Sequence, residues 1–182
     1  MDATTVLLEI LKYTIPAIIV LISSYLIVKK FLVTHIQQKQ LAIFKESQDI
    51  TLRLRLQAYE RLTLFIERIK PRQLIPRIYT PDMTVQDLQQ AIVFTINSEF
   101  EHNLSQQIYV STNVWKTVWG VKEQEVNMTN HISKTLNPEA PALELYGRIM
   151  EMILKSDSEM PTDVALAIIN EEASKVLSYS SY

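Results

Sequence analysis

The sequence contains no cysteine, which excludes disulfide bonds, thiol nucleophiles and thiolate metal sites. It contains only two glycines, Gly120 and Gly147. Two isolated glycines cannot build the phosphate-binding loops of nucleotide-binding proteins, and the tight turns between β-strands usually consume more glycine than this. No Gly-x-Ser-x-Gly motif is present. We therefore predict an all-α protein that is not an enzyme and holds no cofactor.

Histidine is also scarce, with three copies in the chain, and one of them gives a catalytic alternative. Glu99 and His102 form a Glu-x-x-His pair, which is half of the motif of di-iron helical bundles. The second half is missing, because Leu32 and Met128 stand three residues before the other two histidines. A mononuclear metal site or an enzyme site around Glu99 and His102, completed by a carboxylate such as Glu60, is the alternative to polar residues on a helix surface.

One long stretch lacks charge altogether, from Tyr13 to Val28, and it is closed by Lys29 and Lys30. As a helix, these residues would rise about 24 Å, and the apolar residues on both sides extend the run toward a hydrocarbon layer of about 30 Å. We predict a transmembrane helix within residues 6–33, in contact with lipid. Glu9 and Lys12 interrupt its start but stand three apart, where their charges can pair.

Two alternatives to a membrane anchor are weaker. A cleaved signal peptide would have a basic start, whereas Asp2 and Glu9 precede the apolar run and the lysines follow it. A buried core helix would not normally be apolar on all sides for four turns. The C-terminal flank carries more lysines than the N-terminal flank, which predicts an N-terminus outside and a cytoplasmic C-terminal part. We thus expect the protein in the inner, cytoplasmic membrane of a bacterium.

The remaining chain predicts a small helical domain on a stalk. We expect an anchor over residues 1–33, a helical stalk over 34–49 with a break or kink near 48–51, a helical domain over 50–178 and a frayed tail over 179–182. Pro71 and Pro76 predict a connector up to Asp82. Later helices are expected from about 84 to 107–109, from 111 or 112 to about 136, over 142–156 and over 162–178, each with a polar or proline start signal.

Charge is divided unevenly along the chain. Residues 1–77 carry 12 basic and 6 acidic side chains, whereas residues 78–182 carry 6 and 14. Either the basic part lies near an anionic membrane surface, or opposite charges face each other within the fold. The acidic remainder and the lack of a binding motif argue against nucleic acid. We expect six arginines to contact lipid or a partner, and the alternative is that they form a solvated basic face. They are Arg53, Arg55, Arg61, Arg68, Arg72 and Arg77.

Two tryptophans stand one helical turn apart. Trp115 and Trp119 are either core anchors or a patch that binds a partner, since tryptophan serves in both roles. The nearby Asn103–Tyr109 turn is a second candidate contact. A protein partner or a homo-oligomer is expected. The repeat of Ile36, Ile43 and Ile50 at seven residues gives a coiled coil in the stalk only weak support, because its companion positions are polar.

Two runs carry a resemblance to a known family: ITL-x-LRLQAYERL-x-LF-x-ERI from Ile50 and EHNLSQQ-x-YVS from Glu101. With the apolar run, they make the chain resemble an uncharacterised family of bacterial, single-span, membrane-anchored helical proteins over nearly its whole length. The resemblance implies a proline at the position of Arg53, which supports a helix start near that point in the family, whereas arginine carries no such signal here. The resemblance supports the architecture and implies no activity. We expect a non-catalytic adaptor or structural subunit of an envelope complex.

Overall fold

The computed structural model describes residues 3–155 and 159–179, with backbone only for residues 5–7, 9 and 179. The predicted pairing of Glu9 with Lys12 therefore lies outside the described side chains, and residues 180–182 of the predicted tail lie outside the described chain. Over the described residues the secondary structure is helical, with no strand, which confirms the all-α prediction. The chain divides into two compact units, an N-terminal unit of residues 1–50 and a helical domain of residues 51–182.

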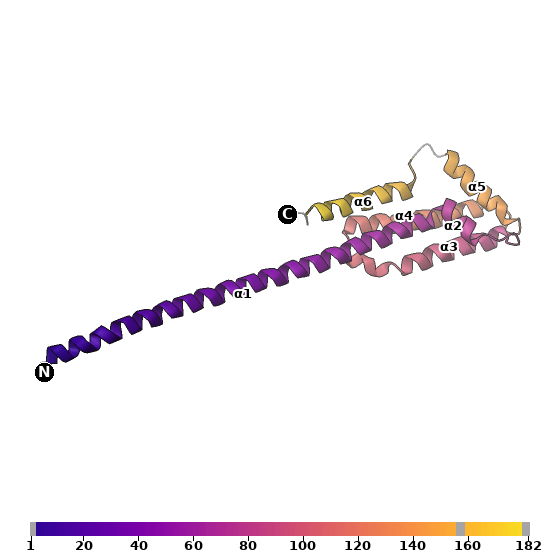
Figure 1. The fold of residues 1–182 in the computed structure, drawn as a ribbon. Helices are drawn as coiled ribbons and strands as arrows, with labels where there is room; N and C mark the ends of the chain where they lie inside the picture. Colours follow the sequence, from indigo (N-terminus) through magenta and orange to yellow (C-terminus); the bar gives the residue numbers. More distant parts are fainter. Residues whose placement is uncertain (1–2, 156–158, 180–182) are drawn as a thin grey trace. The chain divides into compact units, whose positions relative to one another are not determined.

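The first helix, α1 (Ala3–Ile69), contains residues of both units (Figure 1). In the N-terminal unit every described side chain is exposed, including the apolar ones from Ile10 to Val33. Pro16 lies inside the helix. The predicted break near 48–51 is wrong, because the backbone stays helical there. No proline or glycine interrupts this stretch, and the Ser47 hydroxyl donates to the Ile43 carbonyl at 2.9 Å within the helix.

Six further helical segments belong to the described part of the helical domain. They are α2 (Pro71–Ile78), α3 (Val85–Glu101), the 3-10 helix η1 (Leu104–Ile108), α4 (Thr112–Ser133), α5 (Ala142–Lys155) and α6 (Pro161–Tyr179). The predicted connector from Pro71 to Asp82 is thus partly helical. Pro71 occupies the first turn of α2, where its missing N–H is not needed, and the chain leaves the helix soon after Pro76.

The predicted starts of α3 and α4 are confirmed by their capping contacts. The Thr84 hydroxyl accepts from the Asp87 N–H at 3.2 Å while the Asp87 carboxylate accepts from the Thr84 N–H at 3.0 Å, which forms a capping box. The Ser111 hydroxyl accepts from the Val114 N–H at 3.2 Å. The ends differ from prediction: α3 stops at Glu101 rather than near 107–109, and α4 stops at Ser133.

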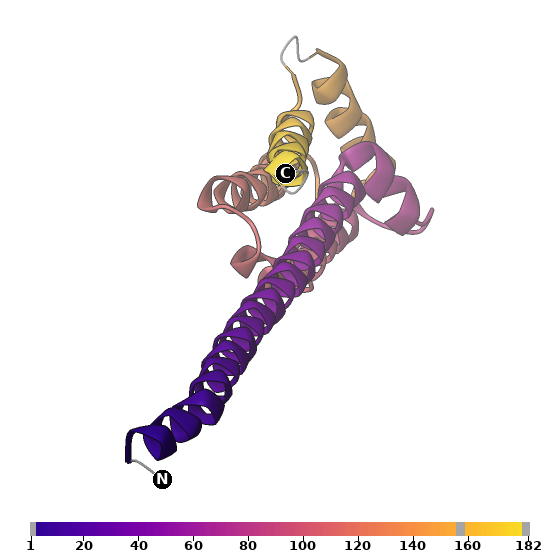
Figure 2. The same ribbon diagram turned by 60° about the vertical axis from the view of Figure 1, so that its left-hand side comes forward.

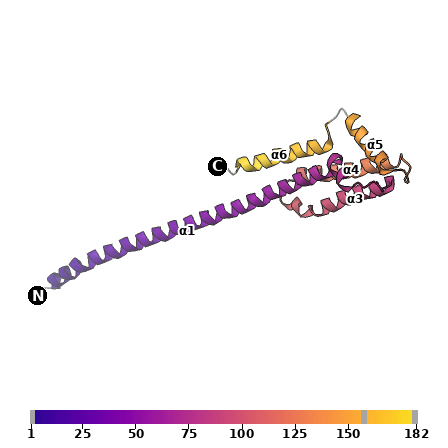
Figure 3. The same ribbon diagram turned by 45° about the vertical axis from the view of Figure 1, so that its right-hand side comes forward.

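The helical domain is built around one core. α3 lies along the last part of α1 (Figures 1 and 3), and α4 and α6 lie side by side in both views (Figures 1 and 2). Backbone hydrogen bonds join the loop before α3 to the loop before α5, including Val85 N–H to Ala140 O at 2.8 Å. Fully buried side chains come from every α-helix of the domain, among them Leu62, Phe65, Ile66, Leu74, Leu88, Ile96, Val114, Leu145, Ile149 and Ile169.

Candidate functional site: a basic groove between α1 and α3

A groove of about 420 Å³ lies between the last part of α1 and α3. We call it the α1–α3 groove. Its walls combine arginine, aliphatic and aromatic side chains with the Glu99–His102 pair. The lining residues are Arg61, Leu64, Phe65 and Arg68 of α1 and Phe94, Thr95, Ser98, Glu99, His102 and Asn103 on or just after α3.

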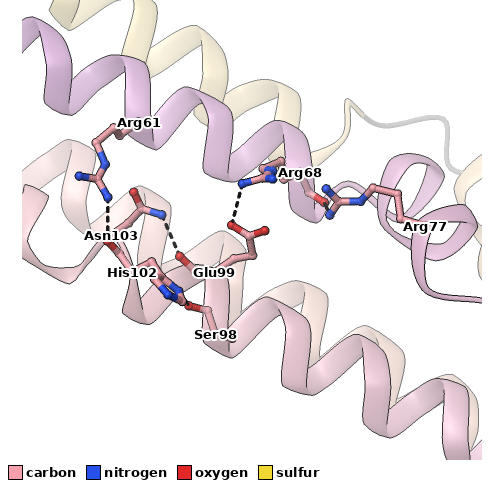
Figure 4. Close-up of polar contacts among 7 residues, drawn as sticks. All are labelled: Arg61, Arg68, Arg77, Ser98, Glu99, His102 and Asn103. Atoms are coloured by element: carbon pink, nitrogen blue, oxygen red, sulfur yellow. Dashed lines mark hydrogen bonds and ion pairs between the residues drawn. The ribbon is translucent and has the colours of Figure 1, made fainter.

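Three arginines make polar contacts in the groove or beside it (Figure 4). Arg61 Nη2 donates to the His102 carbonyl at 3.0 Å, and Arg68 Nη1 lies 3.3 Å from Glu99 Oε2. Arg77 of α2 donates from Nη2 to the Arg68 carbonyl at 3.1 Å. Arg61 and Arg68 are seven residues apart, which places them two turns apart on one face of α1.

The Glu-x-x-His pair takes part in these local contacts. Glu99 pairs with Arg68, and His102 Nδ1 lies 2.6 Å from the Ser98 carbonyl in the same helix. The Asn103 amide donates to the Glu99 carbonyl at 2.8 Å. Over residues 3–155 and 159–179, no three His, Asp or Glu side chains gather in a way that could hold a metal ion, so Glu60 does not complete the hypothetical mononuclear site.

Arg55 belongs to a separate polar network away from the groove. Its guanidinium donates to the Tyr59 hydroxyl at 3.1 Å and to the Tyr109 carbonyl at 3.2 Å. The Tyr59 hydroxyl donates in turn to Glu172 at 2.6 Å, and Ser111 donates to the same carboxylate through its N–H and its hydroxyl. This Glu172 network joins α1 and the start of α4 to α6.

The Glu172 network shifts two ionisation equilibria. Burial alone would raise the pKa of Glu172, but the hydrogen bonds from Ser111 and Tyr59 to its carboxylate outweigh burial and lower that pKa. Burial raises the pKa of the Tyr59 hydroxyl, and its hydrogen bond to Glu172 raises it further. Arg55 was predicted as a contact residue, whereas the structure places it in this internal network.

The other predicted contact residues are dispersed. Arg53 and Arg72 are exposed and lie outside the α1–α3 groove. Trp115 is partly buried and stacks on Phe100 with ring centroids 5.4 Å apart, whereas Trp119 is 52% exposed. The two tryptophans therefore divide between the core and the surface.

Sequence reasoning missed one buried acid, Glu125 of α4. Its side chain is 3% exposed, and Oε2 has no hydrogen-bond partner among the described atoms. Burial raises the pKa of this carboxyl to about 7. A signal was present in the sequence, since Glu125 follows Val118 and Val121 on one helical face and precedes Thr129 by one turn.

The chain is thus an all-α protein with one helix, among the described residues, that is long and apolar enough to cross a membrane. Its sequence matches the model of a family described as a family of unknown function (DUF7935) over residues 5–176. The chain belongs to this family, which confirms the predicted resemblance to an uncharacterised family. No curated protein and no solved structure matches it.

Proposed function

We propose that this protein is a membrane-anchored, cytoplasm-facing adaptor or structural subunit of a bacterial envelope complex, and that it acts by binding rather than by catalysis. Residues 6–33 would cross the inner membrane once. The helical domain would bind a protein partner, or a second copy of the chain, on the cytoplasmic side.

The observation that carries the proposal is the unburied apolar segment of α1. Its most apolar stretch has a mean hydropathy of 2.0, and none of that stretch is buried inside the protein. In water, a helix of this length and composition would expose apolar side chains on all sides, at a cost of about 25 cal/mol for each Å². Lipid removes that cost, and a continuous helix satisfies its own backbone hydrogen bonds in the bilayer.

Lysine placement supports the proposed orientation. Lys29, Lys30, Lys39 and Lys45 follow the apolar segment, whereas Lys12 alone precedes its uncharged part. Cytoplasmic flanks of membrane helices carry an excess of lysine and arginine. The helical domain would then lie in the cytoplasm.

Purification from native membranes tests the adaptor function. The full chain, extracted in mild detergent from the cells that make it, should sediment with a second protein or with further copies of itself at a fixed ratio. Glu171→Gln, at an exposed position outside the α1–α3 groove, should leave that ratio unchanged. Recovery of monomer alone from native membranes would overturn the proposal.

A further inference from the structure

The α1–α3 groove exposes an apolar pair between its arginines. Leu64 of α1 is 53% exposed and Phe94 of α3 is 74% exposed, and both line the groove. Below them lies Phe65, which belongs to the core. Large apolar side chains with a polar rim are typical of surfaces that bind another molecule.

The groove is basic, although the helical domain as a whole is acidic. Its lining contains Arg61, Arg68 and His102 against one carboxylate, Glu99, and Arg77 contacts the backbone of Arg68. By contrast, the helical domain as a whole, residues 51–182, carries 13 basic and 16 acidic side chains. An acidic ligand would therefore be attracted to the groove rather than to the rest of the helical domain.

The arginines retain capacity for such a ligand. The Arg61 contact with His102 and the Arg68 contact with Glu99 each use one terminal nitrogen of a guanidinium that has five N–H donors. The Arg68 side chain is 55% exposed, and exposed ion pairs of this kind contribute little stability. A carboxylate arriving from outside can therefore bind Arg68 without a large loss of internal energy.

The shape of the groove favours a helix over a small molecule. Small-molecule sites enclose most of their ligand, whereas Leu64 and Phe94 are more than half exposed. The lining runs for about two turns along each helix, from Arg61 to Arg68 and from Phe94 to His102, which is about 10 Å or slightly more. Amphipathic helices bind in such grooves through anchors spaced three, four and seven residues apart.

We propose that the α1–α3 groove binds an acid-bearing amphipathic helix of a partner protein. The apolar stripe of that helix covers Leu64 and Phe94, and its carboxylates, two turns apart, pair with Arg61 and Arg68. This inference rests on the proposed adaptor function and assigns its binding surface.

Two other occupants fit less well. On a second copy, α5 exposes Leu143 and Leu154, but its Glu144 and Glu151 are offset by Arg148 and Lys155, so its net charge is not complementary. A lipid surface suits apolar side chains that protrude, whereas Leu64 and Phe94 line a concave site. Both remain outcomes of the test below.

Site-specific photo-crosslinking of the full chain in the cells that make it tests the inference. A benzophenone amino acid replaces Phe94, and the crosslinked peptide is identified by mass spectrometry. The expected product is an amphipathic helical segment of another protein, with carboxylates two turns apart. Its yield should fall about tenfold or more in Arg61→Glu/Arg68→Glu, because two attractive pairs become repulsive. Arg72→Glu, which reverses an exposed charge outside the groove, should leave the yield unchanged.

A second variant guards against misfolding. In this variant the crosslinker replaces Leu64, and Phe94 is changed to glutamate. Phe94→Glu places in the groove a negative charge, of the same sign as the proposed ligand, and removes no hydrogen bond. It should therefore also suppress the crosslinked product. Changing the identified partner carboxylate to arginine should restore crosslinking to the Arg68→Glu variant. A lipid product, a product with a second copy, a basic segment or no product would each overturn the inference. If a partner still co-purifies with Arg61→Glu/Arg68→Glu and Phe94→Glu at the original ratio, the adaptor function stands and the groove assignment fails.

Discussion

At the residue scale, Glu125 is the side chain whose burial conflicts most with its charge. Its pKa is raised to about 7 from an ordinary 4.5, so the folded chain binds this proton more tightly than the unfolded chain does. The stabilising contribution is fully present below pH 4.5 and is lost as the pH rises to about 7. This shift of the Glu125 pKa corresponds to a change of about 3 kcal/mol in the free energy of unfolding.

Glu125→Gln should remove this pH dependence. The variant should match the wild type near pH 4 and exceed its unfolding free energy at pH 8 by up to about 3 kcal/mol, since the amide cannot ionise. Both tryptophans lie in the helical domain, so tryptophan fluorescence in urea, with the full chain in detergent, reports on its unfolding. Glu101→Gln, at an exposed position, serves as control. Equal stability of Glu125→Gln and wild type at both pH values would contradict a buried carboxyl.

Two neighbouring acids on α6 give a matched pair of substitutions. Glu172 accepts hydrogen bonds from Tyr59 and Ser111, whereas the exposed Glu171 pairs with Lys175 one turn away. Glu172→Gln should therefore destabilise the helical domain by about 1–2 kcal/mol, and Glu171→Gln by less than about 0.5 kcal/mol. Urea unfolding at pH 7 measures both. The Glu172 network would be refuted if the two variants were equally stable.

Because the Glu172 pKa is lowered, the stability that its ionised form contributes is present above its ordinary pKa of 4.5 and is lost as the pH falls through the lowered value. This trend is opposite in sign to that of Glu125. The difference between Glu172→Gln and wild type should accordingly shrink in acid, which the same urea experiment can follow.

At the scale of single elements, the starts of α3 and α4 could be predicted from the sequence, whereas the end of α3 could not. Thr84 and Ser111 cap helices through hydroxyls that bind N–H groups three residues ahead, so the sequence contains the whole interaction. The end of α3 depends on Asn103 and His102, whose side chains bind carbonyls of the preceding turn. Such side-chain contacts compete with continuation of the helix, and the spacing of the apolar residues in α3 does not predict them.

At the candidate site, single residues could be predicted from the sequence, but their grouping in space could not. The sequence identified Arg61, Arg68, Glu99 and His102 as residues of interest, but it placed the arginines and the Glu-x-x-His pair in separate hypotheses. Only packing of α1 against α3 brings them together. Arg55 was assigned to the surface, because its acceptor, the Tyr109 carbonyl, lies 54 residues away in the chain.

The cap of α3 provides a prediction at this scale. Thr84→Ala removes the hydroxyl that accepts from the Asp87 N–H and should lower the unfolding free energy by about 1 kcal/mol. Thr84→Ser keeps the hydroxyl and should be close to the wild type. Urea unfolding compares the two, and an alanine variant as stable as the serine variant would show that the cap is not formed.

At the scale of the whole molecule, the stability of each unit has a different physical explanation. The described part of residues 51–182 folds around a core drawn from all its α-helices, whereas the N-terminal unit buries none of its described side chains. Stability of the helical domain therefore comes from packing, and that of the apolar part of α1 would come from lipid. Substitutions in one unit should have little effect on the other.

The natural absence of cysteine makes the membrane topology directly measurable, because any engineered cysteine is unique. Ala3→Cys, Ile19→Cys and Asn127→Cys place a thiol before the apolar segment, within it and on the helical domain. With a membrane-impermeant maleimide, we expect labelling of position 3 on intact cells, labelling of position 127 only after lysis, and protection of position 19 in both. Labelling of position 127 on intact cells, or of position 19 in intact membranes, would contradict a single-span anchor that faces the cytoplasm.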